Sequence, residues 1–181
     1  MKALVLSDTH LPARGPDLPA VVYRALAALR PGDVILHAGD LTSADVLTAL
    51  EAFAPVHAVR GNVDDPEVWA LLPEKRVAAL GPFRVGLVHG HAGPGRDTPD
   101  RAFRAFAGRD RLPDAVVFGH SHQPHREERA GCLLFNPGSP TDRRRAPRCS
   151  FGWLWPEGDR LRAEHVFFDR PDEAPFIPAD R

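Results

Sequence analysis

The sequence predicts an α/β fold whose sheets are mixed, with both parallel and antiparallel strands. Over the first 60 residues, apolar runs of strand length alternate with segments of helical periodicity. This order is typical of parallel strands joined by right-handed crossovers. Further along, apolar runs flank the turn signals Gly81-Pro82 and Pro156-Glu157-Gly158-Asp159, which favour hairpins and therefore antiparallel pairing.

The first third of the chain is predicted to contain three strands and two helices in alternation. In the first helix, apolar residues recur at three- and four-residue spacing until Pro31-Gly32 ends the pattern. Thr42 or Ser43 can cap the second helix, which then extends to about Phe53. Short apolar runs bounded by polar turns give the strands. The strands are expected at residues 2–7, 33–38 and 55–60, and the first helix at 18–30.

The rest of the chain is predicted to mix hairpins with short helices. Residues 66–72 suit a short helix, and residues 76–80 and 83–88 form the two strands of a hairpin. In a further helix at 99–107, Phe103 and Phe106 lie three residues apart. Further strands are expected at 115–118, 133–135, 150–155 and 161–168, and no helix follows them.

Length and composition are those of one globular domain. The chain has 181 residues, of which 43% are hydrophobic and 26% charged. We expect one domain over residues 1–168 and a tail over 169–181, which has too little apolar content to fold alone and is frayed or lies along the surface. The formal net charge of -1 argues against a nucleic-acid partner other than a nucleotide substrate. The sequence does not predict the oligomeric state, and an oligomer is possible.

Cysteine usage and the N-terminus favour a cytoplasmic protein. Cys132 and Cys149 both lie in apolar, strand-like stretches, so we expect reduced core residues rather than a disulfide. The chain reaches Asp8 too soon for the apolar region of a signal peptide. No apolar run approaches the ~18 residues of a membrane span, so no membrane partner is expected.

Five apolar runs end in side chains that bind metals. The central one is Val117-Phe118-Gly119-His120-Ser121-His122, where a turn at Gly119 lets both imidazoles face the crevice at the carboxyl end of a strand. A single His-x-His is weak evidence, but four other runs stop in the same way, at Asp, His or Asn and at no thiol. Together they supply these candidate ligands: Asp8, His10, Asp40, Asn62, His89, His120 and His122.

A ligand set of this size indicates two metal ions rather than one. A tetrahedral zinc needs about four ligands, and two ions roughly 3.5–4 Å apart need a carboxylate that bridges them. A water between two cations is readily deprotonated, which gives a bridging hydroxide that can attack phosphorus in line. The mixture of carboxylate, amide and imidazole suits Mn2+, Fe2+, Zn2+ or Ni2+, and we expect Mn2+ to support activity in vitro. The chemistry indicated is hydrolysis of a small phosphate ester.

The same segments resemble a known family. In the family's order, the sequence contains Asp8-Thr9-His10, Gly39-Asp40, Gly61-Asn62, His89-Gly90-His91 and Gly119-His120-Ser121-His122. These motifs resemble those of the calcineurin-like metallophosphoesterases. Asn136-Pro137-Gly138-Ser139 is similar to a motif of their small bacterial and archaeal phosphodiesterase branch, which is related to the vacuolar-sorting subunit of retromer. The resemblance covers about residues 1–168.

The resemblance implies a fold, an activity and a ligand assignment. The fold is a four-layer α-β-β-α sandwich of two mixed sheets flanked by helices. The activity is that of a dinuclear, metal-dependent phosphodiesterase in which Asp40 bridges the ions. One metal is then held by Asp8, His10, Asp40 and His122, and the other by Asp40, Asn62, His89 and His120. The candidate catalytic residues are Asn62, His89 and His91.

One position departs from the family's phosphatase branch. There the Gly-Asn motif continues with a histidine near the leaving group, whereas this chain has Val63, followed by Asp64. Without that general acid, we expect a preference for phosphodiesters with good leaving groups. His91, two residues beyond His89, either faces the substrate or makes a structural hydrogen bond.

The alternative function is a non-catalytic metal-binding scaffold or protein-interaction module of the same fold. Exposed Trp153 and Trp155 would argue for it, although strand alternation more simply places them on a sheet face. A complete ligand set argues against it, because a scaffold has no physical need to keep one.

Other histidines and arginines have less specific interpretations. His37 and His57 lie inside apolar strands and are expected as core histidines bonded to backbone, whereas His125 and His165 look like surface residues. A basic run and two loop arginines either are solvated or bind phosphate oxygens. These residues are Arg143, Arg144, Arg145 and Arg148 in the run, and Arg14 and Arg96 in the loops.

Overall fold

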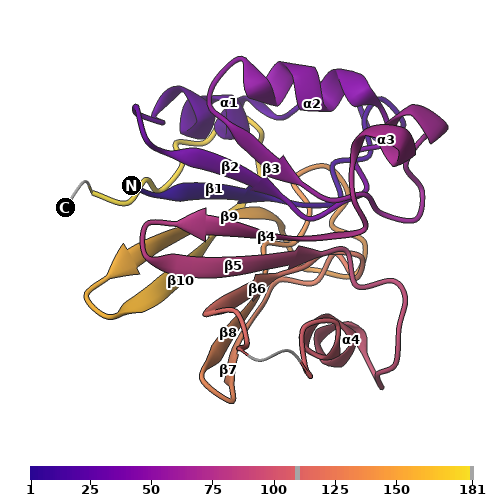
Figure 1. The fold of residues 1–181 in the computed structure, drawn as a ribbon. Coiled ribbons are helices and arrows are strands. Elements are labelled where there is room, and N and C mark those ends of the chain that lie inside the picture. The colour runs from indigo at the N-terminus through magenta and orange to yellow at the C-terminus, as the bar shows by residue number, and fades with distance from the viewer. Residues whose placement is uncertain (109–110, 180–181) are drawn as a thin grey trace.

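The computed structural model, which describes residues 1–108 and 111–179, has the predicted four layers. Two five-stranded sheets face each other (Figure 1). Helices α1 (Ala20–Ala27) and α2 (Ala44–Glu51) cover the outer face of one sheet, and α4 (Thr98–Arg104) covers the other. Three hydrophobic clusters fill the spaces between the layers. The α-β-β-α sandwich implied by the sequence motifs is therefore confirmed.

The first sheet combines the amino-terminal strands with a carboxy-terminal hairpin. Its members are β1 (Ala3–Leu6), β2 (Val34–His37), β3 (Val56–Ala58), β9 (Cys149–Glu157) and β10 (Arg160–Phe168). The order is β10-β9-β1-β2-β3, with β1, β2 and β3 parallel as predicted and the hairpin antiparallel. Side chains alternate along β1, so Leu4 and Leu6 pack under the helices while Ala3 and Val5 pack between the sheets.

The second sheet has three parallel strands with an antiparallel strand at each edge. In spatial order its members are β4 (Lys75–Leu80), β5 (Phe83–Val88), β6 (Ala115–Val117), β8 (Cys132–Asn136) and β7 (His125–Arg129). The predicted hairpin through Gly81-Pro82 is confirmed as β4 and β5. Along the chain, helix α3 (Pro66–Leu71) connects β3 of the first sheet to β4 of the second.

Strand β7 was missed by the sequence analysis. Its sequence, His-Arg-Glu-Glu-Arg, has no apolar residue on either face, so hydrophobic periodicity gives no signal. The strand is nevertheless stable as an edge strand that pairs only with β8 through backbone hydrogen bonds. Charged side chains are common on edge strands because they discourage pairing with another chain.

Most predicted boundaries are correct to within a few residues, and the shift in the last hairpin has a local cause. The turn of the last hairpin was placed at Pro156 to Asp159, but β9 continues through Pro156 to Glu157. Pro156 pairs with Leu161 of β10, whereas β1 pairs with β9 only as far as Leu154. The side of Pro156 that lacks an N–H therefore has no neighbouring strand to bond.

Two histidines lie in surroundings that differ from the prediction. His57 was expected in the core, but it is half exposed because β3 is the edge strand of its sheet. His165 was expected at the surface, but it is half buried, with Nε2 2.7 Å from Asn136 O and its ring centroid 4.6 Å from that of Phe135. It faces the second sheet because it lies on the same face of β10 as the buried Ala163. His125 is partly exposed and pairs with Glu127.

The tail lies along the outer face of the first sheet over residues 169–179, and residues 180–181 are outside the described range. Trp153 is buried and donates its Nε1–H to Phe176 O at 2.9 Å, while Lys2 Nζ lies 3.5 Å from Pro178 O. Trp155 is half buried. The two tryptophans therefore form no exposed patch. Both cysteines are free thiols.

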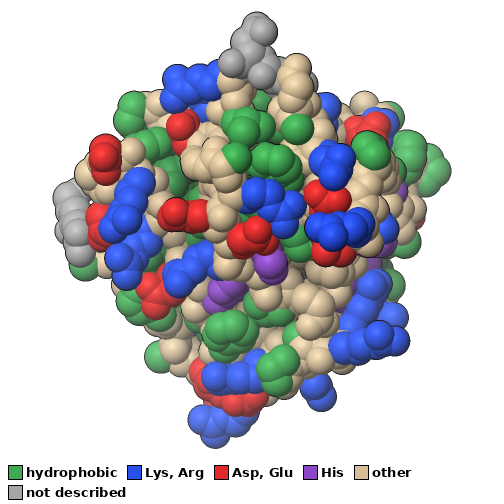
Figure 2. All heavy atoms as spheres, turned by 90° about the horizontal axis from the view of Figure 1, so that it is seen from below, with side chains coloured by type: hydrophobic (Ala, Val, Ile, Leu, Met, Phe, Trp, Pro, Cys, Tyr) green, Lys and Arg blue, Asp and Glu red, His purple; other side chains and the backbone are tan. Residues whose placement is uncertain are grey.

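Charge on the surface is mixed. On the face seen in Figure 2, basic and acidic side chains are interspersed, as the formal net charge of -1 leads one to expect. Among the described residues, no helix is both long enough and apolar enough to span a bilayer.

Candidate metal centre

Five loops converge at the end of the sandwich to which β1, β2, β3 and β5 run, opposite the chain termini (Figure 1). Backbone hydrogen bonds join these loops to one another. His10 N donates to Asp40 O at 3.0 Å, and Gly119 N donates to His89 O at 3.1 Å. The carboxyl ends of parallel strands are the usual binding edge of an α/β sheet. The five sequence motifs thus meet at one place.

One group of candidate ligands is buried and close together. Donor atoms of Asp8, His10 and His122 all lie within 4.8 Å of one another. His122 Nε2 is 3.4 Å from Asp8 Oδ1 and 3.1 Å from His10 Nε2. All three residues are less than a tenth exposed. A carboxylate and two imidazoles with converging nitrogens can hold a divalent metal.

A second group shares Asp8 with the first. Donor atoms of Asp8, Asp40 and His89 also lie within 4.8 Å of one another. Asp40 Oδ2 is 3.1 Å from His89 Nε2 and 3.8 Å from His10 Nε2, so this carboxylate faces both groups. Asn62 Oδ1 and His120 Nδ1, which lie 3.1 Å apart at the more exposed side, complete the predicted ligand set.

The tautomer of His89 can be deduced from its neighbours. Its Nδ1 lies 2.8 Å from Ala38 O, and because a carbonyl only accepts, Nδ1 carries the proton. In the neutral ring, the lone pair of Nε2 then faces the Asp40 carboxylate, which is also an acceptor. Among the described residues, Nε2 is buried without a hydrogen-bond partner. Without a metal, a proton on Nε2 is needed between these two acceptors 3.1 Å apart, and Asp40 accordingly outweighs burial and raises the pKa of His89. A divalent cation could take the place of that proton.

His122 repeats this arrangement on the other side. Its Nδ1 donates to Asp142 O, which leaves the Nε2 lone pair facing Asp8 Oδ1. A backbone carbonyl that orients a histidine in this way is a common companion of metal ligands. The two nitrogens and the two carboxylates therefore form a donor set that fits divalent cations.

Burial and mutual charge shift the pKa values of these groups. Burial raises the pKa of Asp8 to about 6, even though the nearby His89 opposes the shift. Burial also opposes ionisation of Asp40, but His89 outweighs it and the pKa of Asp40 is lowered. Burial lowers the pKa of His120 to about 4 and also lowers the pKa of His122. Both imidazoles are thus kept neutral, the form that binds a metal.

The backbone is strained at the candidate ligands. Non-glycine residues rarely adopt positive φ, and they do so mainly where the surrounding structure enforces it, often at functional sites. Here the left-handed region holds Asp8 (φ 54°), His10 (47°), Asp40 (58°), His120 (66°) and His122 (58°). Each of these loops turns sharply just as it leaves its strand, which directs the side chain toward the centre.

Two glycines allow the loops to approach the carboxylates. A Cβ at Gly61 would lie 2.0 Å from Asp40 Oδ1, and a Cβ at Gly119 would lie 1.8 Å from Ser7 Oγ and 2.7 Å from Asp8 Oδ2. Neither site has room for a side chain. The glycines of the Gly-Asn and Gly-His motifs are therefore required because the backbone at these positions lies against the neighbouring loops.

Comparison with known proteins agrees with this geometry. The model of the calcineurin-like phosphoesterase superfamily domain matches residues 1–157. The chain belongs to this superfamily. A probable metallophosphoesterase of Methanothermobacter thermautotrophicus is 41% identical over 165 residues, which cover 90% of each chain. One of Methanocaldococcus jannaschii is 35% identical over 145 residues, 80% of this chain and 69% of that protein.

A solved structure shares the fold. Vps29 of Entamoeba histolytica, complexed with Zn2+, superposes with a TM-score of 0.73 at 28% sequence identity, covering 92% of each chain. Divalent metals are characteristic of the superfamily, and the two groups described above are where this calcineurin-like phosphoesterase could hold them.

His91 lies at the rim of this centre. Its ring centroid is 5.5 Å from that of His89 and 6.2 Å from that of His120. Among the described residues, its Nδ1 is buried without a hydrogen-bond partner. Of the two interpretations from the sequence, a structural hydrogen bond through Nδ1 therefore finds no support in the structure.

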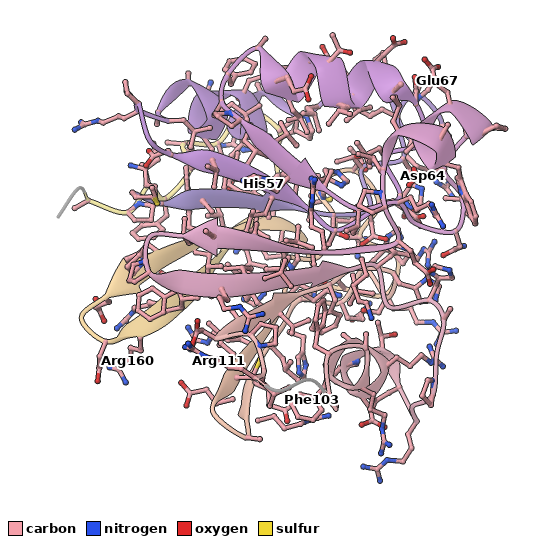
Figure 3. All side chains as sticks on the ribbon, viewed as in Figure 1. His57, Asp64, Glu67, Phe103, Arg111 and Arg160 are labelled. Atoms are coloured by element: carbon pink, nitrogen blue, oxygen red, sulfur yellow. The ribbon has the colours of Figure 1, made fainter. Side chains whose placement is uncertain are left out.

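Asp64 organises the two loops that carry Asp40 and Asn62, a role that sequence reasoning missed. Its carboxylate accepts backbone N–H groups from Asp40 (3.2 Å), Thr42 (2.6 Å) and Gly61 (2.6 Å). Figure 3 shows Asp64 beside α3, at the end of the molecule where the loops converge. The available signal was its position two residues beyond Asn62, which by itself does not reveal bonds to a distant loop.

Ser139 has the corresponding role for the loop of Asp8. Its hydroxyl donates to Asp8 O at 2.7 Å and accepts the backbone N–H of Asp142 at 2.9 Å. Asn136, from the same Asn-Pro-Gly-Ser motif, donates to Gly119 O at 2.9 Å. This motif, recognised in the sequence only as a family resemblance, thus holds two ligand loops in place.

One histidine and two loop arginines remain from the sequence-based candidates. His37 is a buried core histidine, as predicted; its Nδ1 accepts from Gly39 N, and burial lowers its pKa to about 3. Arg14 pairs with Asp142 at 3.1 Å. Arg96 is exposed.

Proposed function

We propose that this chain is a dinuclear, metal-dependent phosphoesterase that prefers phosphodiesters. The observation that carries the proposal is the position of Asp40, whose Oδ2 lies 3.1 Å from His89 Nε2 and 3.8 Å from His10 Nε2. A carboxylate that reaches both groups of donors is what a bridged pair of ions requires.

The proposed ligand assignment follows these contacts. Asp8, His10, Asp40 and His122 hold one ion, and Asp40, Asn62, His89 and His120 hold the other, with Mn2+ as the expected ion in vitro. The cluster of Asp8, His10 and His122 supports the first set, and the 3.1 Å approach of Asp40 to His89 supports the second. The Asn62–His120 contact at 3.1 Å supports the second set.

The solvent exposure of each residue indicates whether it can contact the substrate. Bound divalent ions would supply the Lewis acidity that activates water and offsets the charge of the phosphoryl group. Asn62 is exposed and His120 half exposed, so both can also contact a phosphate oxygen. His89 is fully buried, so its proposed role is to hold an ion rather than to contact the substrate. The natural location is expected to be the cytoplasm and the substrate a small phosphate ester.

The preference for diesters rests on Val63. Its side chain is 45% exposed, and its backbone N–H donates to Asp40 Oδ1 at 3.1 Å, so the position lies at the open side of the centre. A valine there cannot protonate a departing oxygen. The leaving group must then be stable as an anion, and aryl or nucleotide diesters meet that condition.

Metal analysis paired with an ester screen tests the proposal. We expect two transition-metal ions per chain, and hydrolysis that is lost to a chelator and restored by Mn2+. Phosphomonoesters, aryl phosphodiesters and cyclic nucleotides would be compared at equal concentration. Metal-loaded protein that is inert toward every ester class would contradict the enzymatic assignment.

A non-catalytic scaffold is the second candidate, favoured by the likeness to Vps29. A scaffold uses an exposed surface, yet Trp153 is buried and Trp155 half buried, which removes the aromatic patch that the sequence suggested. The ester screen separates the two functions, because a scaffold binds metal without turnover.

A further inference from the structure

One arginine of the basic run lies at the metal centre. Arg144 Nη1 donates to His120 O at 3.3 Å, on the loop that carries His120 and His122. Its neighbours are engaged elsewhere or exposed: Arg143 donates to Ala146 O, Arg148 pairs with Asp169, and Arg145 is exposed. The structure thus separates four arginines that the sequence presents as one cluster.

The position of Arg144 is enforced by strained backbone and by Asp142. Arg144 has φ of 46°, in the left-handed region, within a loop that contains no glycine between Ser139 and Arg148. Asp142 contacts a candidate ligand and two arginines. Its carbonyl accepts from His122 Nδ1, and its carboxylate pairs with Arg14 Nε at 3.1 Å and Arg144 Nε at 3.9 Å. One residue therefore orients both a candidate ligand and the guanidinium beside it.

The guanidinium lies beside the candidate metal ligands, with the carboxylate of Asp142 3.9 Å from its Nε. The bond to His120 O places a fixed positive charge next to the loop that carries two candidate ligands, His120 and His122. A site built to hold cations gains nothing from a further fixed cation nearby, since the two repel each other. The cost is removed when an oxyanion binds to both.

We infer that Arg144 binds a phosphoryl oxygen of the substrate and that Asp142 is its positioning residue. The guanidinium is planar and offers several N–H donors, of which Nη1 is directed to His120 O, and its side chain is 46% exposed and open to a ligand. The inference rests on the proposed function for the identity of the anion as a phosphate ester. The positions of Arg144 and Asp142 stand independently of it.

The test compares inorganic phosphate binding in three Mn2+-loaded proteins. Isothermal titration would be applied to the wild type, Arg144→Gln and the matched control Arg145→Gln, which loses the same charge from the next residue. We expect phosphate to bind about 10- to 100-fold more weakly to Arg144→Gln, as for loss of a charge-assisted hydrogen bond, and within about twofold of wild type for the control. Metal content would be unchanged in both.

A second variant keeps the test informative if Arg144→Gln misfolds. Arg144→Gly removes the guanidinium and relieves the left-handed strain, so its loop is expected to keep its shape. Asp142→Asn should weaken phosphate binding and raise KM while Arg144 is still present, because the side chain loses its anchor. Equal phosphate affinity in wild type and Arg144→Gly, at equal metal content, would overturn the inference.

The two proposals can fail separately. If the metal-loaded wild type hydrolyses no ester but phosphate binding still depends on Arg144, the proposed activity is wrong and the anion site stands. If esters are hydrolysed while Arg144→Gly and Arg145→Gln have the same KM and the same phosphate affinity, the activity stands and the anion site is wrong.

Discussion

The two halves of the metal centre differ in how they are held. In the half formed by Asp8, His10 and His122, all three side chains are buried. In the other half, Asp40 and His89 are also buried, but Asn62 is exposed and His120 is half exposed. The buried half is bonded to the loop after β8 through Ser139 O–H and Asp142 O. If both halves hold a metal as proposed, the first site is enclosed by protein and the second is open on one side.

The open half is held by bonds between two loops. The carboxylate of Asp64 accepts from Asp40 N and Gly61 N, and Val63 N donates to Asp40 Oδ1. A site that must admit a phosphate ester cannot be closed by packing on every side. We therefore expect metal affinity, and its sensitivity to mutation, to differ between the halves.

Asp40→Asn is expected to have the largest effect, because it removes the charge that faces both halves. Asn keeps the shape of the side chain but leaves His89 Nε2 and the second proposed ion without a carboxylate, and the first with only that of Asp8. We expect loss of metal from both positions and at least about a hundredfold lower kcat/KM. Both losses would be measured as metal content and as turnover after chelation and Mn2+ addition.

The control for this variant is Asp159→Asn, an exposed carboxylate in the turn between β9 and β10, at the far end of the sandwich. It should change neither metal content nor rate. Full, chelator-resistant activity in Asp40→Asn would remove Asp40 from the centre and with it the division into two bridged halves.

The Mn2+ affinities of His122→Ala and Asn62→Ala test whether the two halves bind metal independently. His122→Ala removes a buried ligand, so we expect loss of the tighter Mn2+ site and of turnover, with cooperative unfolding retained because the residue lies outside the hydrophobic clusters. Asn62→Ala should weaken the other site and leave the first intact. Calorimetric titration with Mn2+ gives both affinities, and equal losses in the two variants would show that the halves do not differ.

Asp64→Asn tests how the open half is supported. An amide can accept some of the N–H groups, but its own NH2 repels others, so the loops of Asp40 and Asn62 lose a shared anchor. We expect about 10- to 100-fold weaker metal binding at the open half and roughly 1–3 kcal/mol lower stability. Asp65→Asn is the matched control, since Asp65 is exposed and makes no side-chain cap to α3. Similar metal affinities in the two variants would refute the role of Asp64.

The sequence was sufficient for the candidate ligands but not for their supports. Candidate metal ligands can be proposed from chemistry alone, because Asp8 or His122 after an apolar run stands out. Asp64 and Ser139 act instead as hydrogen-bond partners of backbone groups in distant loops, and a carboxylate or hydroxyl in a loop has many other uses. Only the three-dimensional arrangement reveals such partners.

The same limit applies to the fold. The parallel core was predictable because its strands are buried on both faces and therefore apolar throughout. Strand β7 was not, since an edge strand needs only backbone pairing. His57 and His165 were misjudged for a related reason: exposure depends on which strand lies at the edge, and hydrophobic pattern does not give strand order.

The smallest effect is expected at His91, which lies on the open half without being a candidate ligand. If Val63 marks the absence of a general acid, the rate should depend steeply on the pKa of the leaving group. His91→Ala should then leave that slope unchanged and lower the rate less than about tenfold. The measurement is kcat/KM for a series of aryl phosphodiesters whose phenols differ in acidity.

The opposite result would give His91 a different role. Its ring is within 6.2 Å of that of His120, and its Nδ1 has no hydrogen-bond partner among the described residues, so the residue is placed where an acid would be useful. General acid catalysis is typically worth about 10²- to 10⁴-fold and flattens the dependence on the leaving group. A flat slope in wild type that steepens in His91→Ala would show that an acid exists. The inference from Val63 would then be wrong, and the diester preference would need another cause.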